Sequence, residues 1–365
     1  GNNIANVNTA GFKASSTQFQ DTLSQLQQGA TGPQAQTGGS NPAQIGLGVR
    51  VTGVTTNFSQ GSSQSTGRAT DMMISGDGFF VTSKGGQQLF TRAGAFSPDA
   101  ANQLVSPDGG ILQGWTATNG VVNAGGPVGD ITLNPNTMVA KKTDTVTLDG
   151  NLPSDAALGT KLDRVVNVYD ATGAESSLTL TFSKTAAGWD ASDDGGATTV
   201  GSLAFTNGQL NAGAPITVNG ITIDVSKVSG YATMSSLAVS GQNGAAVGKL
   251  ESYTLGSDGS LVGSFSNGIK QVLAKIALAK FTNPGGLEKA GGSSYVATGN
   301  SGGVQLGAAG DPGIGTLTGG SLEMSNVDLS QEFTNLIVAQ RGFQANARII
   351  TTSDEVLQEL TQLKR

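Results

Sequence analysis

Histidine and cysteine are both absent from this chain of 365 residues. Without an imidazole, Ser-His-Asp and Cys-His nucleophile systems are excluded, and the commonest metal ligand is missing. Without a thiol, the chain has no disulfide, no thiolate zinc site and no cysteine redox chemistry. Only 13% of the residues are charged, so pairs of carboxylates for acid–base catalysis are few. The composition therefore speaks against an enzyme, and neither a cofactor nor a metal is expected.

Basic clusters and long apolar runs are also scarce. The formal net charge is −6, and the only adjacent basic pairs are Lys141-Lys142 and Lys364-Arg365. A nucleic-acid-binding protein normally carries a basic stripe, so no nucleic-acid partner is expected. The strongest apolar run, residues 272–279, contains Lys275 and is much shorter than the roughly 18 residues that a membrane helix needs. Membrane insertion is therefore not expected.

Glycine, in contrast, is abundant, with 55 residues. Apolar alternation persists between the glycines, as at Val49, Val51 and Val54, which favours an ordered β-rich body over disorder. Turn sequences with Asp-Gly predict β-hairpins. The predicted hairpins join residues 72–74 to 79–81, 103–105 to 111–113, and 253–255 to 261–263.

Several single features are read as structural. Gly46-Leu47-Gly48 begins like a dinucleotide-binding fingerprint but lacks the third glycine and a helix after it, so it predicts the entry to a strand. Trp115 and Trp189 are predicted to lie in the cores of small domains. Lys13 and Arg68 are predicted to lie on the surface, where they contact other molecules or are solvated.

The C-terminal tail changes character. From Ser321 to Arg365 there is no proline, and Gly342 is the only glycine. A seven-residue apolar repeat in this tail predicts a helix over 326–363 that packs along other helices, from neighbouring copies above all. The repeat and the residues that widen it are Leu329, Leu336, Phe343, Ile350 and Leu357, with Phe333, Ile337, Ala347 and Leu360.

The two ends of this helix carry matching signals. Residues 325–328 fit a capping box, and Asp328 and Glu332 lie where the helix dipole favours anions. Lys364 and Arg365 suit the opposite end. The alternative is that the stripe folds back on its own domain.

The N-terminal segment also reads as helical at its start. Ile4, Ala5 and Asn8 lie at helical spacing, and residues 8–11 predict a stop. Because the sequence does not begin with methionine, we expect a segment before Gly1 to carry the body of this helix. Residues 15–28 are polar and either helical or extended, and residues 29–41 read as a linker.

The order of these segments predicts a mainly β fold with α-helical termini. A terminal helical domain combines residues 1–28 with 322–365, and a connecting segment spans 29–58. A discontinuous body β domain combines 59–147 with 245–321, and an outer β domain, 148–244, is inserted into it. Strands of the insert are predicted at 164–169, 177–183, 215–218 and 221–225.

Both ends of the chain resemble the signatures of bacterial flagellar rod and hook proteins, and residues 75–80 and 91–96 resemble the body domain of that family. The matching N-terminal positions are Asn2, Asn3, Asn6, Thr9, Gly11, Phe12 and Lys13. The matching C-terminal positions are Asn326, Asp328, Gln340, Arg341 and Asn346.

Within the family, the resemblance favours a hook subunit, because residues 148–244 supply the outer domain that rod subunits lack. Residues 27–44, however, are similar to an insert of distal rod proteins, which implies a stiffer tube. The resemblance implies a homopolymer of many copies: a curved extracellular tube that joins the rod to the filament and transmits torque as a universal joint.

In that tube the terminal helices, with Ile4, Ala5 and the apolar stripe, are expected to form the inner wall. The resemblance further implies export through the flagellar type III apparatus and contacts with rod proteins, hook–filament junction proteins and a hook cap. Two alternatives stay open from the sequence: a distal rod protein, and a secreted β-rich adhesin that binds a ligand through residues 148–244.

Overall fold

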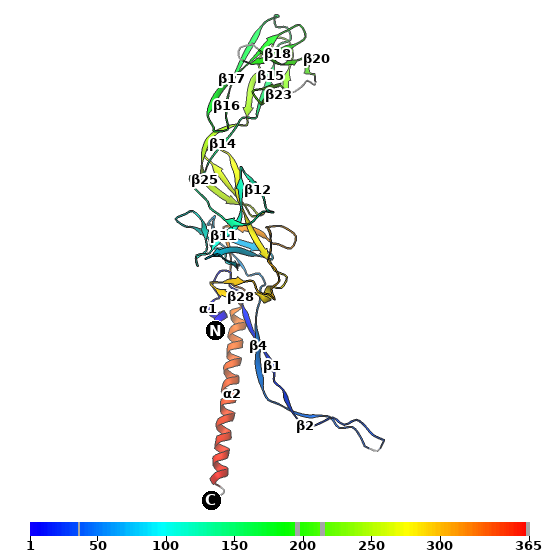
Figure 1. Cartoon of the computed structure of the whole chain (residues 1–365), viewed down its shortest axis with the longest axis vertical. Helices are drawn as coiled ribbons and strands as arrows, with labels where there is room; N and C mark the ends of the chain where they lie inside the picture. Colours follow the sequence, from blue (N-terminus) through cyan, green and yellow to red (C-terminus); the bar gives the residue numbers. More distant parts are fainter. Residues whose placement is uncertain (36, 194–197, 212–215, 363–365) are drawn as a thin grey trace. The chain divides into compact units, whose positions relative to one another are not determined.

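The computed structural model describes residues 1–35, 37–193, 198–211 and 216–362. Over these residues the chain consists mainly of β-strands, with one long helix, α2 (Leu329–Gln362), and a short one, α1 (Asn2–Ala5) (Figure 1). The mainly β fold with a helical C-terminus is confirmed. At the N-terminus, α1 is limited to four residues, so the helical part of the predicted 1–28 segment is short.

The chain separates into two compact units. Unit 1 contains Gly1–Leu133, Thr254–Val262 and Val272–Arg365, and unit 2 contains Asn134–Tyr253 and Gly263–Gln271. Unit 2 is therefore longer than the predicted insert of 148–244. The reason is that β14 (Met138–Lys141) pairs with β25 (Ala245–Leu255) outside both predicted boundaries.

The body of unit 1 is a set of short antiparallel strands. β27 (Lys270–Lys280) pairs with β7, β11 and β30 through residues 274–280, and β7 continues the sheet through β8 and β29 to β28. The bounds of the body strands besides β27 are β5 (Ser63–Ser65), β6 (Met72–Ser75), β7 (Phe79–Lys84), β8 (Gln87–Thr91), β9 (Ser97–Pro98), β10 (Leu104–Val105), β11 (Ile111–Thr118), β12 (Val121–Val122), β13 (Gly129–Asp130), β28 (Glu288–Gly291), β29 (Ser294–Val296), β30 (Gln305–Ala308), β31 (Thr316–Gly319) and β32 (Ser321–Glu323). The first three residues of β26 (Ser260–Phe265) also belong to unit 1.

Aromatic rings fill the core of this body. Phe79, Phe90 and Phe281 are buried and meet edge to face, with ring centroids 4.8 Å apart for Phe90 and Phe281. Tyr295 belongs to the same cluster, and the centroid of its ring lies 6.1 Å from that of Phe79. Trp115 packs in a separate small cluster with Ala277 and Ala308 and is buried, as predicted.

Two of the three predicted hairpins form. Val105 pairs with Ile111 across the first Asp-Gly turn, and the Gly256 amide donates to the Ser260 carbonyl across the second. The third prediction is wrong: β6 and β7, on either side of residues 75–78, do not pair with each other. β6 pairs with β31 instead, while β7 enters the main sheet. Asp-Gly chemistry fixes a turn, but the partner of each strand is decided by distant residues.

The described residues between 15 and 56, which are 15–35 and 37–56, form a long two-stranded ribbon. β1 (Ser15–Asp21) pairs with β4 (Val49–Thr56), β2 (Ser24–Gln28) pairs with β3 (Ala43–Gly46), and single bridges join Thr31 to Ser40 and Gln34 to Thr37. The predicted helical or extended segment 15–28 is thus extended, and the predicted linker, 29–41, lies at the end of the ribbon, where Thr31 pairs with Ser40. The β-branched residues of β4 explain the preference for a strand.

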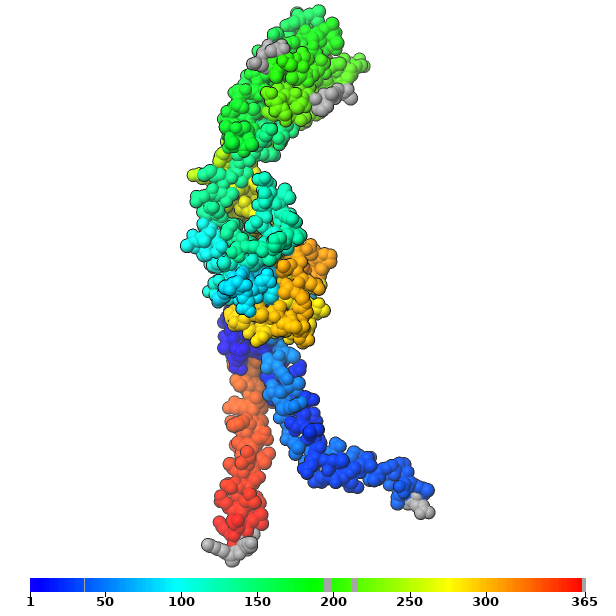
Figure 2. Space-filling model, in the orientation of Figure 1, coloured from blue at the N-terminus to red at the C-terminus, as the bar shows by residue number. Residues whose placement is uncertain are grey.

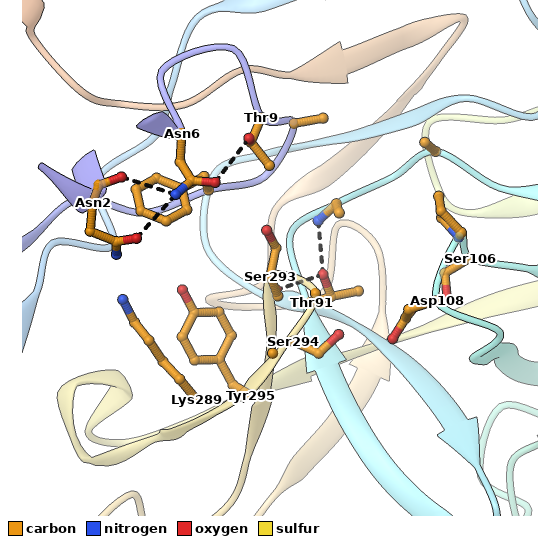
Figure 3. Close-up of a pocket in the computed structure, with 17 residues that line it drawn as sticks. Asn2, Asn6, Thr9, Thr91, Ser106, Asp108, Lys289, Ser293, Ser294 and Tyr295 are labelled. Atoms are coloured by element: carbon orange, nitrogen blue, oxygen red, sulfur yellow. Dashed lines mark hydrogen bonds between the residues drawn. The ribbon is translucent and has the colours of Figure 1, made fainter. Parts of the chain in front are cut away.

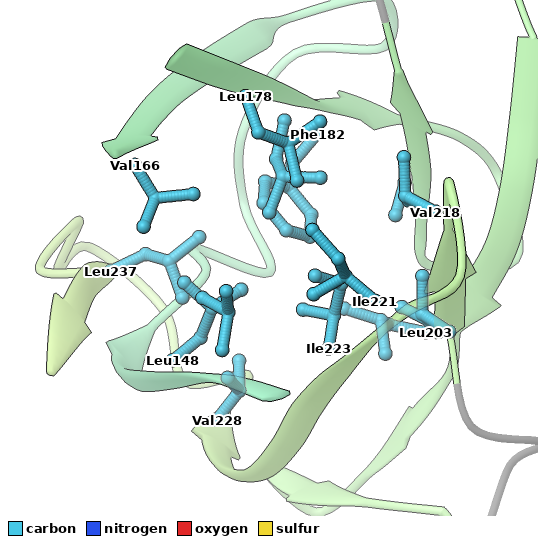
Figure 4. Packing of buried hydrophobic residues seen from close by; sticks show 14 of the residues in the cluster. Leu148, Val166, Leu178, Phe182, Leu203, Val218, Ile221, Ile223, Val228 and Leu237 are labelled. Carbon is cyan, nitrogen blue, oxygen red and sulfur yellow. The ribbon is translucent and has the colours of Figure 1, made fainter. Parts of the chain in front are cut away.

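The core of unit 2 lies between two four-stranded sheets. One is ordered β22-β23-β15-β24 and the other β16-β17-β18-β19, and their apolar side chains meet in one core (Figure 4). Trp189 lies in this core, as predicted. The strands are β15 (Thr145–Asn151), β16 (Lys161–Tyr169), β17 (Glu175–Lys184), β18 (Trp189–Asp193), β19 (Thr198–Leu203), β20 (Phe205–Thr206), β21 (Gln209–Leu210), β22 (Ile216–Val218), β23 (Ile221–Ser229) and β24 (Ala238–Gln242).

The strands predicted for this region are found, apart from Pro215, which lies outside the described residues. The Asn219-Gly220 turn joins β22 to β23 with φ values of 51° and 78°, the left-handed pair that suits a two-residue hairpin.

Candidate assembly surfaces and the polar junction at their base

The helix α2 begins at a cap formed by Asp328. Its Oδ1 accepts hydrogen bonds from the backbone amides of Ser330, at 2.8 Å, and Gln331, at 3.2 Å. This satisfies two of the free amides of the first turn. The helix therefore starts three residues later than the predicted 326, and the predicted cap at Ser325 is wrong. The predicted C-terminal charges, Lys364 and Arg365, lie outside the described residues.

Along its described length, α2 has no buried residue. Phe343 is 77% exposed and Ile350 71% exposed, and Figure 2 shows the orange-to-red helix uncovered on the face in view. The alternative in which the stripe folds back on its own domain is therefore wrong for this structure. The exposed large apolar side chains are Leu329, Phe333, Leu336, Ile337, Val338, Phe343, Ile349, Ile350, Val356, Leu357 and Leu360.

A second apolar line runs along α2. Val338, Ile349 and Val356 are separated by about three and two turns, so they share one face. Val338 follows Leu329 by about two and a half turns and so faces away from the start of the heptad stripe. The helix thus offers apolar contacts on more than one side.

The ribbon is amphipathic as well. Directly paired residues of two antiparallel strands point to the same face. The pairs Phe19–Val51, Thr17–Val54 and Asp21–Val49 therefore share a face, and Phe19, Val49, Val51 and Val54 are all more than half exposed. The opposite face is polar, with Ser16 and Thr55 joined by a hydrogen bond of 3.0 Å between their hydroxyls. We refer to Phe19, Val49, Val51 and Val54 as the ribbon face.

At the base of α2 and the ribbon lies a buried ionic cluster. The Lys13 ammonium donates to Glu323 Oε1 and, at 2.7 Å, to the Ser59 carbonyl, and the Lys13 and Glu323 side chains are fully buried. Arg92 Nη1 lies 3.4 Å from Glu323 Oε2, and Arg92 Nη2 donates to the Gly76 carbonyl at 2.7 Å. The prediction that Lys13 lies on the surface is therefore wrong. Arg68 is exposed, as predicted.

Burial changes the acid–base behaviour of the two cations. Desolvation lowers the pKa of Lys13, partly offset by its hydrogen bond to Glu323. Desolvation likewise lowers the pKa of Arg92, and attraction to Glu323 opposes this. The cluster sets two cations against one carboxylate, and Arg92 Nε has no hydrogen-bond partner among the described residues.

Two asparagines connect the same region. Asn326 Oδ1 accepts from the Ala14 amide at 2.8 Å, and Asn326 Nδ2 donates to the carbonyls of Asn57 and Ser59. Asn3 is hydrogen-bonded to the backbone of Ser15 in both directions and donates to Glu332 Oε1 of α2 at 2.9 Å. These contacts join the two ends of the chain.

Close packing between Gly11 and Ala93 in this junction requires glycine. Gly11 has φ of +70°, and a Cβ placed there would lie 2.3 Å from the Ala93 nitrogen. Its amide donates to the Glu323 carbonyl at 2.8 Å. Gly11 thereby brings the N-terminal segment onto β32 beside the ionic cluster.

A pocket of about 580 Å³ opens beside the N-terminal segment (Figure 3). Asn6 Nδ2 donates to the Asn2 carbonyl at 2.9 Å, and the Thr9 hydroxyl donates to Asn6 Oδ1 at 3.1 Å. Across the pocket, Lys289 Nζ lies 5.5 Å from the centre of the Phe12 ring. The charged residues that line it, Asp108 and Lys289, include no pair of carboxylates, so the pocket offers no acid–base pair of the glycosidase kind.

The structure divides the site residues predicted from the sequence into several groups. Asn3, Gly11, Lys13 and Asn326 meet at the junction, while Asp328 caps the first turn of α2. Asn2, Asn6, Thr9 and Phe12 line the pocket instead. The residues on α2 are spread over the exposed helix instead: Gln340, Arg341, Asn346, Ala347 and the apolar stripe. Ile4 is half-buried and Ala5 exposed in α1.

Sequence reasoning missed Glu323 and Arg92 as members of the ionic cluster. Both stand within or beside segments singled out for other reasons, since Arg92 lies in residues 91–96 and Glu323 precedes the capping region. Nothing local marks either of them as buried. Within the described residues, no helix is long and apolar enough to cross a membrane, and no three acidic residues are grouped to hold a metal.

Comparison with known proteins agrees with the resemblance at both ends. Residues 73–152 match the D1 domain of flagellar hook proteins FlgE/F/G, and residues 318–363 match the C-terminal part of flagellar basal body rod FlgEFG proteins. The flagellar hook protein FlgE of Borreliella burgdorferi is 40% identical over all of this chain and 95% of its own length. The chain belongs to the flagellar hook protein family. The expectation of a hook structural subunit is confirmed.

Two further relatives are also similar to this chain over its whole length. The hook protein FlgE of Salmonella typhimurium is 35% identical, covering all of this chain and 95% of its own. The basal-body rod protein FlgG of Bacillus subtilis is 32% identical, covering all of this chain and 92% of its own. The hook relatives favour the hook over the rod, and no relative named here is an adhesin.

Proposed function

We propose that copies of this chain form the hook tube by packing the apolar stripe of α2 against helices of neighbouring copies. The observation that supports this is the exposure of eleven large apolar side chains on α2, from 38% at Leu329 to 77% at Phe343. Burying one such side chain fully is worth about 1.5–3 kcal/mol. A helix with this surface gains stability when neighbouring helices cover it.

The pattern of the stripe suits a wall of many helices. A strict seven-residue repeat drifts around a straight helix and favours left-handed supercoiling with a partner. Polar Gln340, Asp354 and Thr361 share the other seam of the repeat, which weakens a simple two-stranded coil. The N-terminal segment with Ile4 and Ala5 supplies part of the same inner wall.

The ribbon face provides a second surface for contacts between copies. Four apolar side chains lie on one side of a two-stranded ribbon, and a ribbon of only two strands has no sheet behind it to cover that side. Because such ribbons are marginally stable alone, packing against a neighbouring copy would stabilise this one. Residues 29–41 at its tip are the part that we expect to resist bending.

Bending of the tube requires contacts between copies to change without being lost. Uncharged polar side chains on α2 exchange hydrogen bonds at little cost, because each net bond is worth only about 1 kcal/mol. Gln331 Nε2 already donates to Asn335 Oδ1 at 3.2 Å within the helix and is free to rotate toward a neighbour. Gln344, Asn346 and Thr351 are polar residues of the same kind.

The proposed place of the assembled protein is the flagellum outside the cell, reached through the flagellar type III apparatus. Its proposed partners are the rod, the hook–filament junction proteins and a cap during growth. A catalytic role is not part of the proposal, because the chain has neither histidine nor cysteine.

Electron microscopy of purified chain under polymerising conditions tests the function. A curved tube supports the hook subunit. A straight, short tube would instead indicate a distal rod subunit. Residues 27–44 of the ribbon are similar to an insert of that kind of protein. Particles that stay monomeric at every concentration would contradict both and leave the adhesin.

A further inference from the structure

The ionic cluster joins segments that are far apart in the sequence. Lys13 comes from the N-terminal segment, Arg92 from the end of β8, and Glu323 from β32, just before α2. Glu323 Oε1 also accepts from the Gly61 amide at 2.9 Å, next to the ribbon's end. One carboxylate thus contacts the N-terminal segment, the residues that follow the ribbon, and the body.

The surrounding hydrogen bonds follow the same plan. The Ser59 carbonyl accepts from Lys13 Nζ and from Asn326 Nδ2, at 2.7 and 3.0 Å. The Met324 amide donates to the Ser62 carbonyl at 2.8 Å, and β32 pairs with β5. A Cβ at Gly61 would lie 1.9 Å from the Met324 carbonyl oxygen, so the two segments are in close backbone contact.

From this arrangement we propose that Lys13, Glu323 and Arg92 act as one attachment point, which we call the latch. It holds three segments to the body: the N-terminal segment around Lys13, the residues that follow the ribbon around Gly61, and β32 before α2. The three segments are attached together and released together. The physical reason is that Glu323 is the shared partner of both cations, and a buried charge that loses its partner is strongly destabilising. When one segment leaves the cluster, the charges that stay buried lose a partner. This loss weakens the attachment of the other segments. The latch itself is a property of the single chain, and only its consequence for assembly rests on the proposed function.

Lys13→Met is the most informative variant. It keeps the length and most of the packing of the side chain, and it leaves Arg92 and Glu323 as a balanced pair. Lys84→Met is the matched control, because it makes the same change at an exposed ion pair, 3.8 Å from Asp108. Glu323→Gln is the stronger variant, because it removes the one carboxylate that contacts both buried cations.

Hydrogen exchange of the dilute monomer reports the latch residue by residue. In Lys13→Met we expect the amides of Gly11, Ala14, Gly61 and Met324 to exchange at least about tenfold faster, and by similar factors, as concerted opening requires. Amides of β7 and β11 should keep their wild-type rates. Lys84→Met should leave all of them unchanged.

Three results would overturn the latch. In the first, all four amides of Lys13→Met keep their protection from hydrogen exchange. In the second, only the amides of Gly11 and Ala14 lose protection. In the third, the amides of β7 and β11 lose as much protection as the four amides do. The second result means independent anchors, and the third means that Lys13 serves only global stability. If Glu323→Gln does not fold, Lys13→Met still decides between these results.

The consequence for assembly is measured separately. A released α2 root and ribbon would present their apolar surfaces in variable directions, so the critical concentration for Lys13→Met polymers should rise several-fold, while that of Lys84→Met stays the same. If the wild-type chain forms no polymer, the proposed function fails, but the exchange experiment on the monomer still tests the latch.

Discussion

The helix α2 and the junction at its base have opposite polarity. On α2, phenylalanine, leucine and isoleucine side chains are exposed, whereas at the junction Lys13, Arg92 and Glu323 are buried. Soluble monomers generally do the reverse with both kinds of residue. The difference shows which contacts the single chain completes by itself and which it leaves to other copies.

The junction is complete within one chain. Glu323 meets an ammonium, a guanidinium and a backbone amide, so its charge is compensated without any neighbour. The apolar surface of α2 has no such compensation in the described chain. Changes at the two regions should therefore separate folding from assembly, and the following variants are designed to test that separation.

The largest effect is expected from acidic residues on the stripe. Phe343→Asp combined with Ile350→Asp should abolish polymerisation, because two charges would be buried between helices. The thermal unfolding of the monomer should be unchanged, since both side chains are exposed. Electron microscopy and calorimetry measure the two outcomes.

Thr334→Asp with Thr352→Asp is the matched control for that double variant. These exposed residues are five turns apart on the side of α2 opposite Phe343 and Ile350, and they add the same charge. Loss of polymers in the control too would show that net charge, rather than the apolar stripe, governs assembly. Normal tubes from Phe343→Asp with Ile350→Asp would refute the inner-wall assignment.

At the junction, the expected effect is on folding, and it is asymmetric. Glu323→Gln should lower the free energy of unfolding by about 3–5 kcal/mol, because two buried cations lose their counter-charge. Lys13→Met should cost about 1–3 kcal/mol, because a balanced pair remains. Urea unfolding followed by Trp115 fluorescence, in a Trp189→Phe background, measures both. An equal or reversed order would contradict the charge count.

Shortening the ribbon should change the curvature of the assembled tube more than the folding stability of the single chain. Deleting residues 29–41 removes the tip beyond β2 and leaves the pairing of β1 with β4 intact. We expect tubes of greater curvature, because contacts between copies along the tube are lost. Micrographs that show the wild-type curvature would contradict a stiffening role for the ribbon.

The smallest effect is a pH dependence inside the body. Burial raises the pKa of Tyr295 to about 12, above its ordinary value of 10.0. A raised pKa means that this group's contribution to stability is complete below pH 10 and is lost as the pH rises toward 12, by up to about 2–3 kcal/mol. Tyr295→Phe should match the wild type at pH 7 and lose less stability between pH 10 and 12. Parallel stability curves for the two proteins would contradict this.

Local patterns were predicted well from the sequence. The seven-residue repeat gave α2 almost to its ends, and Asn219-Gly220 gave a two-residue turn with both φ values positive. Both depend on residues within a few positions of one another. The start of α2 was predicted three residues early because Asn326 bonds to Ala14, Asn57 and Ser59, which no local pattern reveals.

Pairing between distant segments was not predictable in the same way. The polar residues 15–28 fit either a helix or a strand until the β-branched strand β4 supplies a partner. Met72–Ser75 was predicted to pair with its neighbour in sequence but pairs with β31, more than two hundred residues later. Such choices depend on the whole sheet.

By itself, the sequence determined that this chain lacks the histidine and cysteine of Ser-His-Asp, Cys-His and thiolate sites, that its body is β-rich and that its tail is a helix with an apolar stripe. The tertiary structure alone decided that Lys13 is buried, because its partners, Glu323 and the Ser59 carbonyl, stand 310 and 46 residues away in the sequence. It also decided that the ribbon has an apolar face, since a face exists only once the register of two strands is fixed. Composition and periodicity act locally, whereas burial and register are properties of segments brought together by folding.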